Sequence, residues 1–311
     1  MDLHDKQSLF TSKTILAPMV RAGRTPLRLL SLEYGADLVY TEEIVDQRLL
    51  SCQRIQNDCL DTIDFTTGDD VVLRIASIEK EKCVLQKNAA EICRRFSSDV
   101  MAIDLNMGCP KPFSVHSGMG AALLSDSIKA KEILTSMIAA APPSTPITCK
   151  IRLLDSHDKT MEFIKMLESC GLSAIAVHGR RRSERPNNDC RYSELNEISR
   201  YFSTPIIVNG GSLDIKNFEN IKEFKERTEA KSVMIARAAF TNPSIFCKSG
   251  LKSMPVEIFN FLEKASLFDE NYTAAKYVVQ RILGSQQEFD PKGKGYSLCC
   301  YFKRNLLNLG S

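Results

Sequence analysis

Residues 147–178 read ITCKIRLLDSHDKTMEFIKMLESCGLSAIAVH, and this stretch shows how the chain is organised. A short apolar run at residues 147–150 is followed by a helical pattern at residues 160–170. A second apolar run follows at residues 174–178. Strand, helix and strand in this order predict a parallel βαβ unit.

Apolar runs of the same kind recur along most of the chain. There are eight, at residues 15–19, 38–41, 83–86, 102–106, 147–150, 174–178, 205–209 and 233–237. Amphipathic stretches lie between them, for example at residues 25–34, 127–140 and 194–202. Eight strand–helix units favour a closed (β/α)8 barrel, a TIM barrel, over an open sheet.

Two regions depart from this repeat. Residues 49–80 are too long for a simple crossover, so we expect a helix and a small hairpin around residues 71–75 there. From about residue 255 to residue 309 the pattern is helical without strands, with a break near residues 290–293. We therefore predict an α/β TIM-barrel domain at residues 1–250, followed by a small all-helical domain at residues 251–311.

Composition excludes several classes of protein. The 311 residues are 43% hydrophobic, and 41 Lys and Arg against 38 Asp and Glu give a net charge of +3. Disorder is therefore not expected, and contacts with nucleic acid would depend on local basic patches. No apolar run approaches the ~20 residues of a membrane helix, and the N-terminus lacks the pattern of a signal peptide.

The cysteines point to a reducing compartment. There are 11, an odd number, and none form a C-x-x-C pair or a zinc-site spacing. Free thiols fit this pattern better than a disulfide framework. We expect no metal and no membrane partner, and a location in the cytoplasm with the nucleus as an additional compartment.

The chemistry of a TIM barrel lies at the carboxyl ends of its strands. The predicted ends carry Met19, Glu42, Glu43, Gln86, Asn106, Lys150, His178, Asn209 and Arg237. Gly210-Gly211 follows the seventh run and Ala236-Arg237 the eighth, where barrels commonly bind phosphate through backbone N–H groups and an arginine. No G-x-G-x-x-G motif is present, so this predicts a mononucleotide cofactor. A simple tight turn is the alternative for Gly210-Gly211.

The segment IDLNMGCPK at residues 103–111 carries a family resemblance. With Gly120-Ala121 it resembles the signature of the tRNA-dihydrouridine synthases, flavin enzymes that reduce a uracil ring in tRNA. Matching motifs continue from residue 15 to about residue 246, including APMV at 17–20, KIR at 150–152 and HGR at 178–180. Residues 16–21 and 118–126 are most similar to eukaryotic members that modify D-loop position 20.

The resemblance implies a cofactor, a reductant and a proton donor. FMN, reduced by NADPH, would pass hydride to C6 of the uracil, and Cys109 would give a proton to C5. A thiol with an unperturbed pKa of ~8.5 is mostly protonated at neutral pH, which suits an acid. A buried structural thiol is the alternative reading of Cys109.

The resemblance also assigns the binding residues. The predicted FMN-binding residues are Pro18, Met19, Gln86, Lys150, His178, Asn209, Gly210, Gly211, Ala236 and Arg237. The predicted substrate residues are Glu43, Asn106, Arg152 and Arg180, with Asn106 and Arg152 at the uracil edge. A rim salt bridge for Lys150 and a capping role for His178 are the alternatives.

One position departs from the family pattern, and one region has to supply the contacts with tRNA. The family usually has a glycine shortly after Gln86, where this chain has residues 87–89 KNA, so Gln86 is the less secure flavin contact. Some relatives end in a double-stranded-RNA-binding domain, which is not seen here. We therefore expect the barrel mouth and the helical region to bind tRNA. Nothing in the sequence indicates an obligate partner, so we also expect a monomer. Candidate phosphate contacts are Arg180, Arg181, Arg182, Arg185, Lys292, Lys294, Lys303 and Arg304, and a solvated basic surface is the alternative.

Two rival functions stay open at this point. An FMN barrel acting on a small molecule would not need the Asn-x-Gly-Cys-Pro loop or the helical domain. A catalytically inactive tRNA-binding barrel would carry a damaged flavin site, whereas Lys150, His178 and Arg237 are all present.

Overall fold

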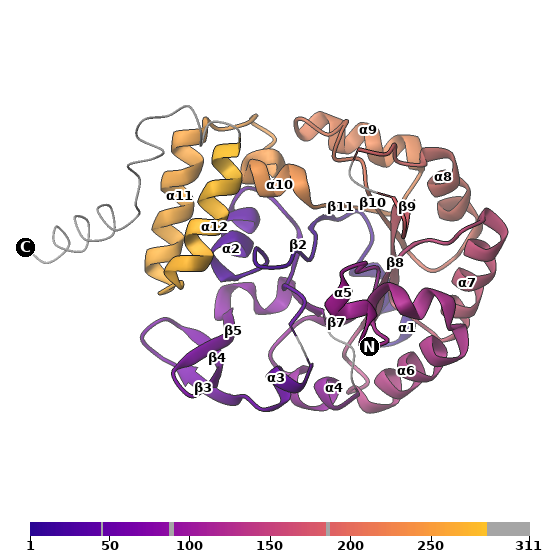
Figure 1. The fold of residues 1–311 in the computed structure, drawn as a ribbon, viewed down its shortest axis with the longest axis horizontal. Coiled ribbons are helices and arrows are strands. Elements are labelled where there is room, and N and C mark those ends of the chain that lie inside the picture. The colour runs from indigo at the N-terminus through magenta and orange to yellow at the C-terminus, as the bar shows by residue number, and fades with distance from the viewer. Residues whose placement is uncertain (45, 87–89, 185–186, 285–311) are drawn as a thin grey trace, which may run out of the picture.

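The computed structural model describes residues 1–44, 46–86, 90–184 and 187–284. Its centre is a closed barrel of eight parallel strands, in the order β1-β11-β10-β9-β8-β7-β6-β2 (Figure 1). The strands are β1 (Thr14–Leu16), β2 (Leu38–Tyr40), β6 (Cys83–Gln86), β7 (Ala102–Met107), β8 (Ile147–Leu153), β9 (Ala174–Arg181), β10 (Ile206–Asn209) and β11 (Ser232–Ile235). The predicted TIM barrel is confirmed.

The strand ends differ from the predicted ones by a few residues. β1 stops at Leu16, and Ala17 still donates to the Ile235 carbonyl at 2.8 Å. Pro18 follows and has no N–H to continue the ladder. β8 and β9 each extend three residues beyond the prediction, which carries Arg152 and Arg180 on strands rather than on loops.

Helices surround the barrel and cover its strands. They are α1 (Leu3–Ser8), α2 (Thr25–Glu33), α4 (Ala90–Phe96), α5 (Pro112–Val115), α6 (Ser127–Ala140), α7 (His157–Ser169), α8 (Tyr192–Tyr201), α9 (Phe218–Thr228) and α10 (Arg237–Thr241). Short 3-10 turns are η1 (Ser77–Lys82), η2 (Gly120–Ser125) and η3 (Pro243–Phe246). α7 shows the pattern, because the Ser156 side chain caps its first turn and Phe163, Ile164 and Leu167 face the strands.

Two apolar layers hold the barrel together. Alternate strand residues pack inside it, among them Ile15, Tyr40, Val84, Ala176, Ile207 and Met234, all nearly inaccessible. Their neighbours along each strand face the helices and form the larger outer core. Strands buried on both faces are expected where helices cover a parallel sheet.

An insertion follows β2. It consists of α3 (Asp46–Leu50) and an antiparallel sheet of β3 (Gln53–Asn57), β4 (Thr62–Thr67) and β5 (Asp70–Ala76). The predicted helix is confirmed, but the predicted hairpin is incomplete, because β3 adds a third strand. The Phe65 and Phe96 rings, 4.5 Å apart, attach the sheet to α4.

Two helices follow the barrel, α11 (Met254–Leu267) and α12 (Tyr272–Leu283), at the upper left of Figure 1. α11 packs along α2, where Asn260 donates to the Tyr34 hydroxyl at 2.7 Å and Lys264 pairs with Glu33 at 2.8 Å. The division of the chain at residue 250 stays a prediction. Residues 290–293, Lys292, Lys294, Lys303 and Arg304 lie outside the described residues, as does Arg185.

Within the described ranges, no helix is long and apolar enough to cross a membrane. Over the same residues, no cluster of three or more His, Cys, Asp and Glu side chains could hold a metal ion. The nine cysteines described are all free thiols.

Candidate active site

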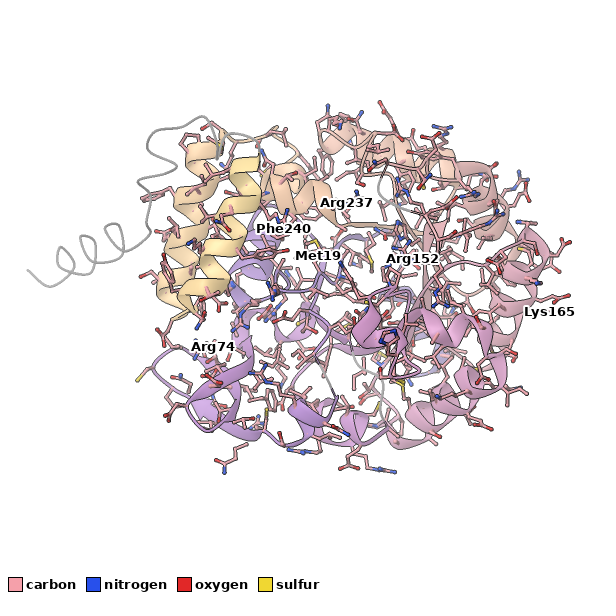
Figure 2. The ribbon with its side chains drawn as sticks, in the orientation of Figure 1. Met19, Arg74, Arg152, Lys165, Arg237 and Phe240 are labelled. Carbon is pink, nitrogen blue, oxygen red and sulfur yellow. The ribbon has the colours of Figure 1, made fainter. Side chains whose placement is uncertain are left out.

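The predicted site residues lie at the carboxyl ends of the barrel strands. Figure 2 shows Met19, Arg152 and Arg237 grouped over the centre of the barrel, whereas Lys165 of α7 lies at its rim. The parallel register places Asn106 beside Lys150, and Arg152 beside His178, on neighbouring strands. The site is therefore assembled by the barrel itself.

The loop after β7 holds Cys109 in a fixed position. The Asn106 Oδ1 accepts from the backbone N–H of Gly108 at 2.9 Å and of Cys109 at 3.1 Å. The Gly108 carbonyl accepts from the Arg152 Nε at 2.9 Å. Gly120 has φ +56°, and a Cβ there would lie 2.7 Å from the Cys109 carbonyl oxygen. Only glycine fits this approach, so the loop is tightly built.

The Cys109 thiol is protonated at neutral pH. Burial, together with the negative charge of Glu43, raises its pKa to about 11. The Lys111 backbone and the Ser114 side chain of α5 are further polar neighbours, and the Ser114 Oγ donates to the Glu43 Oε1 at 3.1 Å. Glu43 therefore lies beside the thiol that the sequence singles out as the acid.

Lys150 lies on the neighbouring strand β8. Burial and the nearby Arg152 lower its pKa to about 8. The buried Asp104 offsets this in part, and burial raises the pKa of that carboxyl to about 6. Asp104 accepts from the Gln86 Nε2 at 2.8 Å and from the Thr148 Oγ1 at 2.7 Å. The Gln86 amide thus donates into the barrel interior.

His178 is neutral. Burial, followed by the charges of Lys150 and three arginines, holds its pKa well below the usual range. The His178 Nε2 lies 3.3 Å from the Arg180 Nη1, and an arginine can only donate, so Nε2 is the unprotonated nitrogen. The buried Arg180 also donates to the carbonyls of Gly210 at 2.5 Å and Asn188 at 2.7 Å.

A small cavity of about 50 Å³ lies beyond β10 and β11. It is lined by His178, Asn209, Gly210, Ser212, Ile215, Met234, Ile235, Ala236 and Arg237. The buried Ser212 hydroxyl has no hydrogen-bond partner among the described residues, and Arg237 pairs with none of their carboxylates. Burial and the nearby Arg180 lower the pKa of Arg237. A free hydroxyl and an unbalanced cation beside glycine backbone fit a phosphate group.

Comparison with known proteins agrees with this geometry. The family model described as Dihydrouridine synthase (Dus) matches residues 15–290. This chain belongs to the dihydrouridine synthase family. The match includes the barrel from the second residue of β1 onward, the Cys109 loop and the phosphate-type cavity.

Two yeast relatives are similar to this chain over most of its length. Each carries the name tRNA-dihydrouridine(20) synthase [NAD(P)+]. The one from Schizosaccharomyces pombe is 36% identical over 88% of this chain and 60% of its own length. The one from Saccharomyces cerevisiae is 33% identical over 90% of this chain and 79% of its own. The chain thus spans about three fifths of the first relative and four fifths of the second.

A solved structure is similar in fold alone. The DHODH of Eimeria tenella, crystallised in complex with ferulenol, has a TM-score of 0.51 at 13% identity. The likeness covers 86% of this chain and 84% of that chain.

The structure brings most of the predicted site residues together. Those at the mouth or the cavity are Met19, Glu43, Asn106, Cys109, Lys150, Arg152, His178, Asn209, Gly210, Ala236 and Arg237. Pro18 is half-buried just before Met19, and Gly211 packs against Ile215 and Phe224. Their individual roles stay predictions. The sequence predicts no role for Ser212, Ser114 or Asp104. Each lies one to five residues from a predicted site residue, and this proximity is the sequence feature that could have identified them.

Proposed function

We propose that this chain is a flavin-dependent tRNA-dihydrouridine synthase that uses FMN and NADPH. It reduces the C5–C6 double bond of a D-loop uridine, at position 20. The names of the two yeast relatives support the substrate and its position. The observation that carries the chemistry is the protonated Cys109 thiol at a mouth rich in cations.

The cavity beyond β10 and β11 would hold the phosphate of FMN, through Arg237, Ser212 and the Gly210 loop. The neutral His178 and the cationic Lys150 would lie against the rest of the cofactor. When bound, FMN supplies the hydride that the uracil C6 receives. The ammonium of Lys150 favours negative charge on a group bound beside it, because opposite charges attract.

Cys109 supplies the proton for C5. The S–H bond breaks, a C–H bond forms at C5, and the sulfur keeps the electron pair as a thiolate that regains a proton from water. Asn106 holds the loop through its Oδ1, and Arg152 holds it through the Gly108 carbonyl. We propose that both also read the uracil edge, and that Arg180, buried beneath the Gly210 loop, supports the site from below.

The function is tested by nucleoside mass analysis of unmodified tRNA after incubation with the protein, FMN and NADPH. We expect a uridine in the D-loop to gain two hydrogens. The variant Cys109→Ala loses at least ~100-fold in rate, the typical contribution of a positioned acid. The exposed thiol of Cys59 is the matched control, and Cys59→Ala keeps the full rate.

Two other outcomes would contradict the proposal. A yellow protein that NADPH bleaches without any change in tRNA would point to a small-molecule substrate. A protein that binds no FMN would indicate an inactive tRNA-binding barrel. Binding to tRNA through the barrel mouth and helical region, a monomeric state, and a cytoplasmic and nuclear location belong to the same proposal.

A further inference from the structure

The stability of the fold does not explain why the Glu43 carboxylate is held in its buried position. Its Oε1 accepts from the Ser114 Oγ at 3.1 Å, but its Oε2 is buried and has no hydrogen-bond partner among the described residues. A buried carboxylate oxygen without a donor destabilises a fold. Such a group calls for an explanation, and the Glu43 carboxylate is both a neighbouring charge and a side-chain hydrogen-bond partner of the Cys109 thiol.

Three separate elements meet at this point. Glu43 follows β2, Cys109 follows β7, and Ser114 lies in α5. Lys150 from β8 also interacts with the thiol and acts in the opposite direction to Glu43. A carboxylate after β2 and an ammonium on β8 therefore both act on the sulfur.

We propose that Glu43 is a positioning residue for the proton transfer, which keeps the proton on Cys109 and promotes its replacement after each turnover. This inference rests on the proposed function. When the thiol gives its proton to C5, the resulting thiolate lies beside a carboxylate. Repulsion between the two negative charges favours uptake of a new proton from water, which restores the thiol.

The neighbouring Glu42 provides a matched control. Its Oε2 accepts from the Arg21 backbone N–H at 2.9 Å, and its Oε1 pairs with Arg24 at 3.4 Å. Glu42 thus uses both oxygens on groups other than the thiol. Glu43→Gln and Glu42→Gln remove the same charge one residue apart, but only the first acts on Cys109.

The test measures alkylation of Cys109 by iodoacetamide as a function of pH, quantified on the peptide that contains this residue. Because the thiolate is the reactive form, Glu43→Gln is expected to react about tenfold faster at pH 8.5, one pKa unit being a tenfold change in thiolate. Glu43→Asp keeps the charge and stays close to the wild-type rate. Glu42→Gln keeps the wild-type profile.

Turnover of tRNA gives the second readout. Glu43→Gln is expected to lower kcat with little change in the KM for tRNA. An unchanged alkylation profile in Glu43→Gln, or a Glu43→Asp profile equal to that of Glu43→Gln, would overturn the inference. A rise in KM alone would instead make Glu43 a substrate contact. Alkylation does not require tRNA reduction, so failure of the proposed function and failure of this inference are separately visible.

Discussion

At the scale of single residues, the mouth holds its polar groups in charge states that differ from those in water. Cys109 keeps its proton far into the alkaline range, His178 stays neutral, and Lys150 loses its proton near pH 8. Burial is the first cause in all three cases, and neighbouring charges decide the rest. Because the described cations here outnumber the carboxylates, the site favours an anionic ligand.

We expect the buried charge of Lys150 to lower the stability of the flavin-free protein and to strengthen the binding of FMN. Its pKa is 10.5 in the unfolded chain and about 8 when folded, so between these values the unfolded chain holds more protons. The free energy of unfolding of the flavin-free protein therefore rises with pH across this window. We expect Lys150→Met to raise the Tm at pH 7 by about 2 °C or more and to flatten the pH dependence.

The same variant is expected to bind FMN more weakly, by fluorescence titration at pH 7. Lys165→Met is the control, because Lys165 is exposed on α7 at the barrel rim (Figure 2). A lower Tm for flavin-free Lys150→Met, or unchanged FMN affinity, would contradict this role of Lys150.

At the scale of elements, the sequence predicts the repeated strand–helix units of the barrel but misses part of the insertion that interrupts them. The eight barrel strands are buried on both faces and show as apolar runs. β3 leaves no such signal in the sequence because four of its five residues are exposed, so it has no apolar alternation. The site could be predicted at the strand ends. Contacts between segments far apart in the sequence, such as Glu43 with Ser114 of α5, depend on packing that no local pattern encodes.

Two glycines with the same backbone conformation allow the Cys109 loop to be tested. Gly120 has φ +56° and Gly68 has φ +57°. A Cβ at Gly120 would collide with the Ser114 Oγ and the Cys109 carbonyl oxygen, whereas nothing lies within 4 Å at Gly68. Gly68→Ala is expected to cost only about 1 kcal/mol from backbone strain.

Gly120→Ala adds the collision to that strain. We expect it to cost at least ~2 kcal/mol of unfolding free energy in urea and to reduce tRNA turnover more than tenfold. Equal losses in the two variants would show that the Cys109 loop can shift freely.

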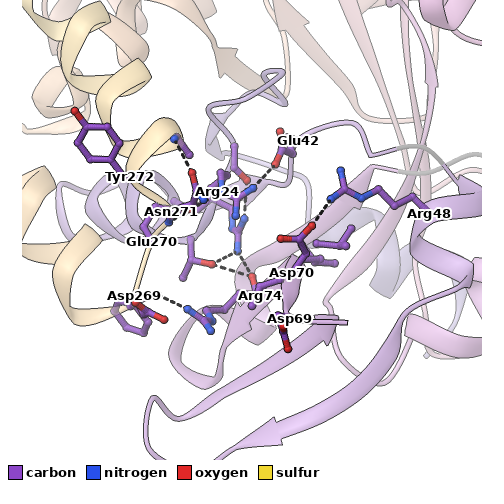
Figure 3. Close-up of a pocket in the computed structure, with 18 residues that line it drawn as sticks. Arg24, Glu42, Arg48, Asp69, Asp70, Arg74, Asp269, Glu270, Asn271 and Tyr272 are labelled. Atoms are coloured by element: carbon purple, nitrogen blue, oxygen red, sulfur yellow. Dashed lines mark hydrogen bonds and ion pairs between the residues drawn. The ribbon is translucent and has the colours of Figure 1, made fainter. Parts of the chain in front are cut away.

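At the scale of the whole molecule, a cleft of about 510 Å³ marks where three parts of the fold meet. It lies between the start of α2, strand β5 and the loop from α11 to α12 (Figure 3). Arg74 pairs with Asp64 at 2.7 Å and also donates to the Phe268 carbonyl, which joins the small sheet to the helical pair. The cleft is lined by both arginines and carboxylates. This mixture of charges suits ion pairs within the protein better than it suits a phosphate ligand.

Arg24 connects the helical pair to the barrel mouth across this cleft. It pairs with Glu270 at 2.7 Å and with Glu42 at 3.4 Å, and Glu42 is adjacent to Glu43 in the chain. Glu270 is only 6% exposed, so removing Arg24 leaves a mostly buried carboxylate without its main partner. Arg24→Met is therefore expected to cost about 1–3 kcal/mol of unfolding free energy.

A double-mutant cycle of Arg24→Met with Glu270→Gln isolates this connection from other effects. We expect a coupling energy of about 1 kcal/mol, because the pair is largely shielded from water. The exposed pair of Arg94 and Glu91, with side chains 60% and 50% exposed, is the control and should couple by no more than about 0.5 kcal/mol. If the helical region holds tRNA, Arg24→Met also raises the KM for tRNA. Equal coupling in both pairs would mean that Arg24 does not join the helical pair to the mouth.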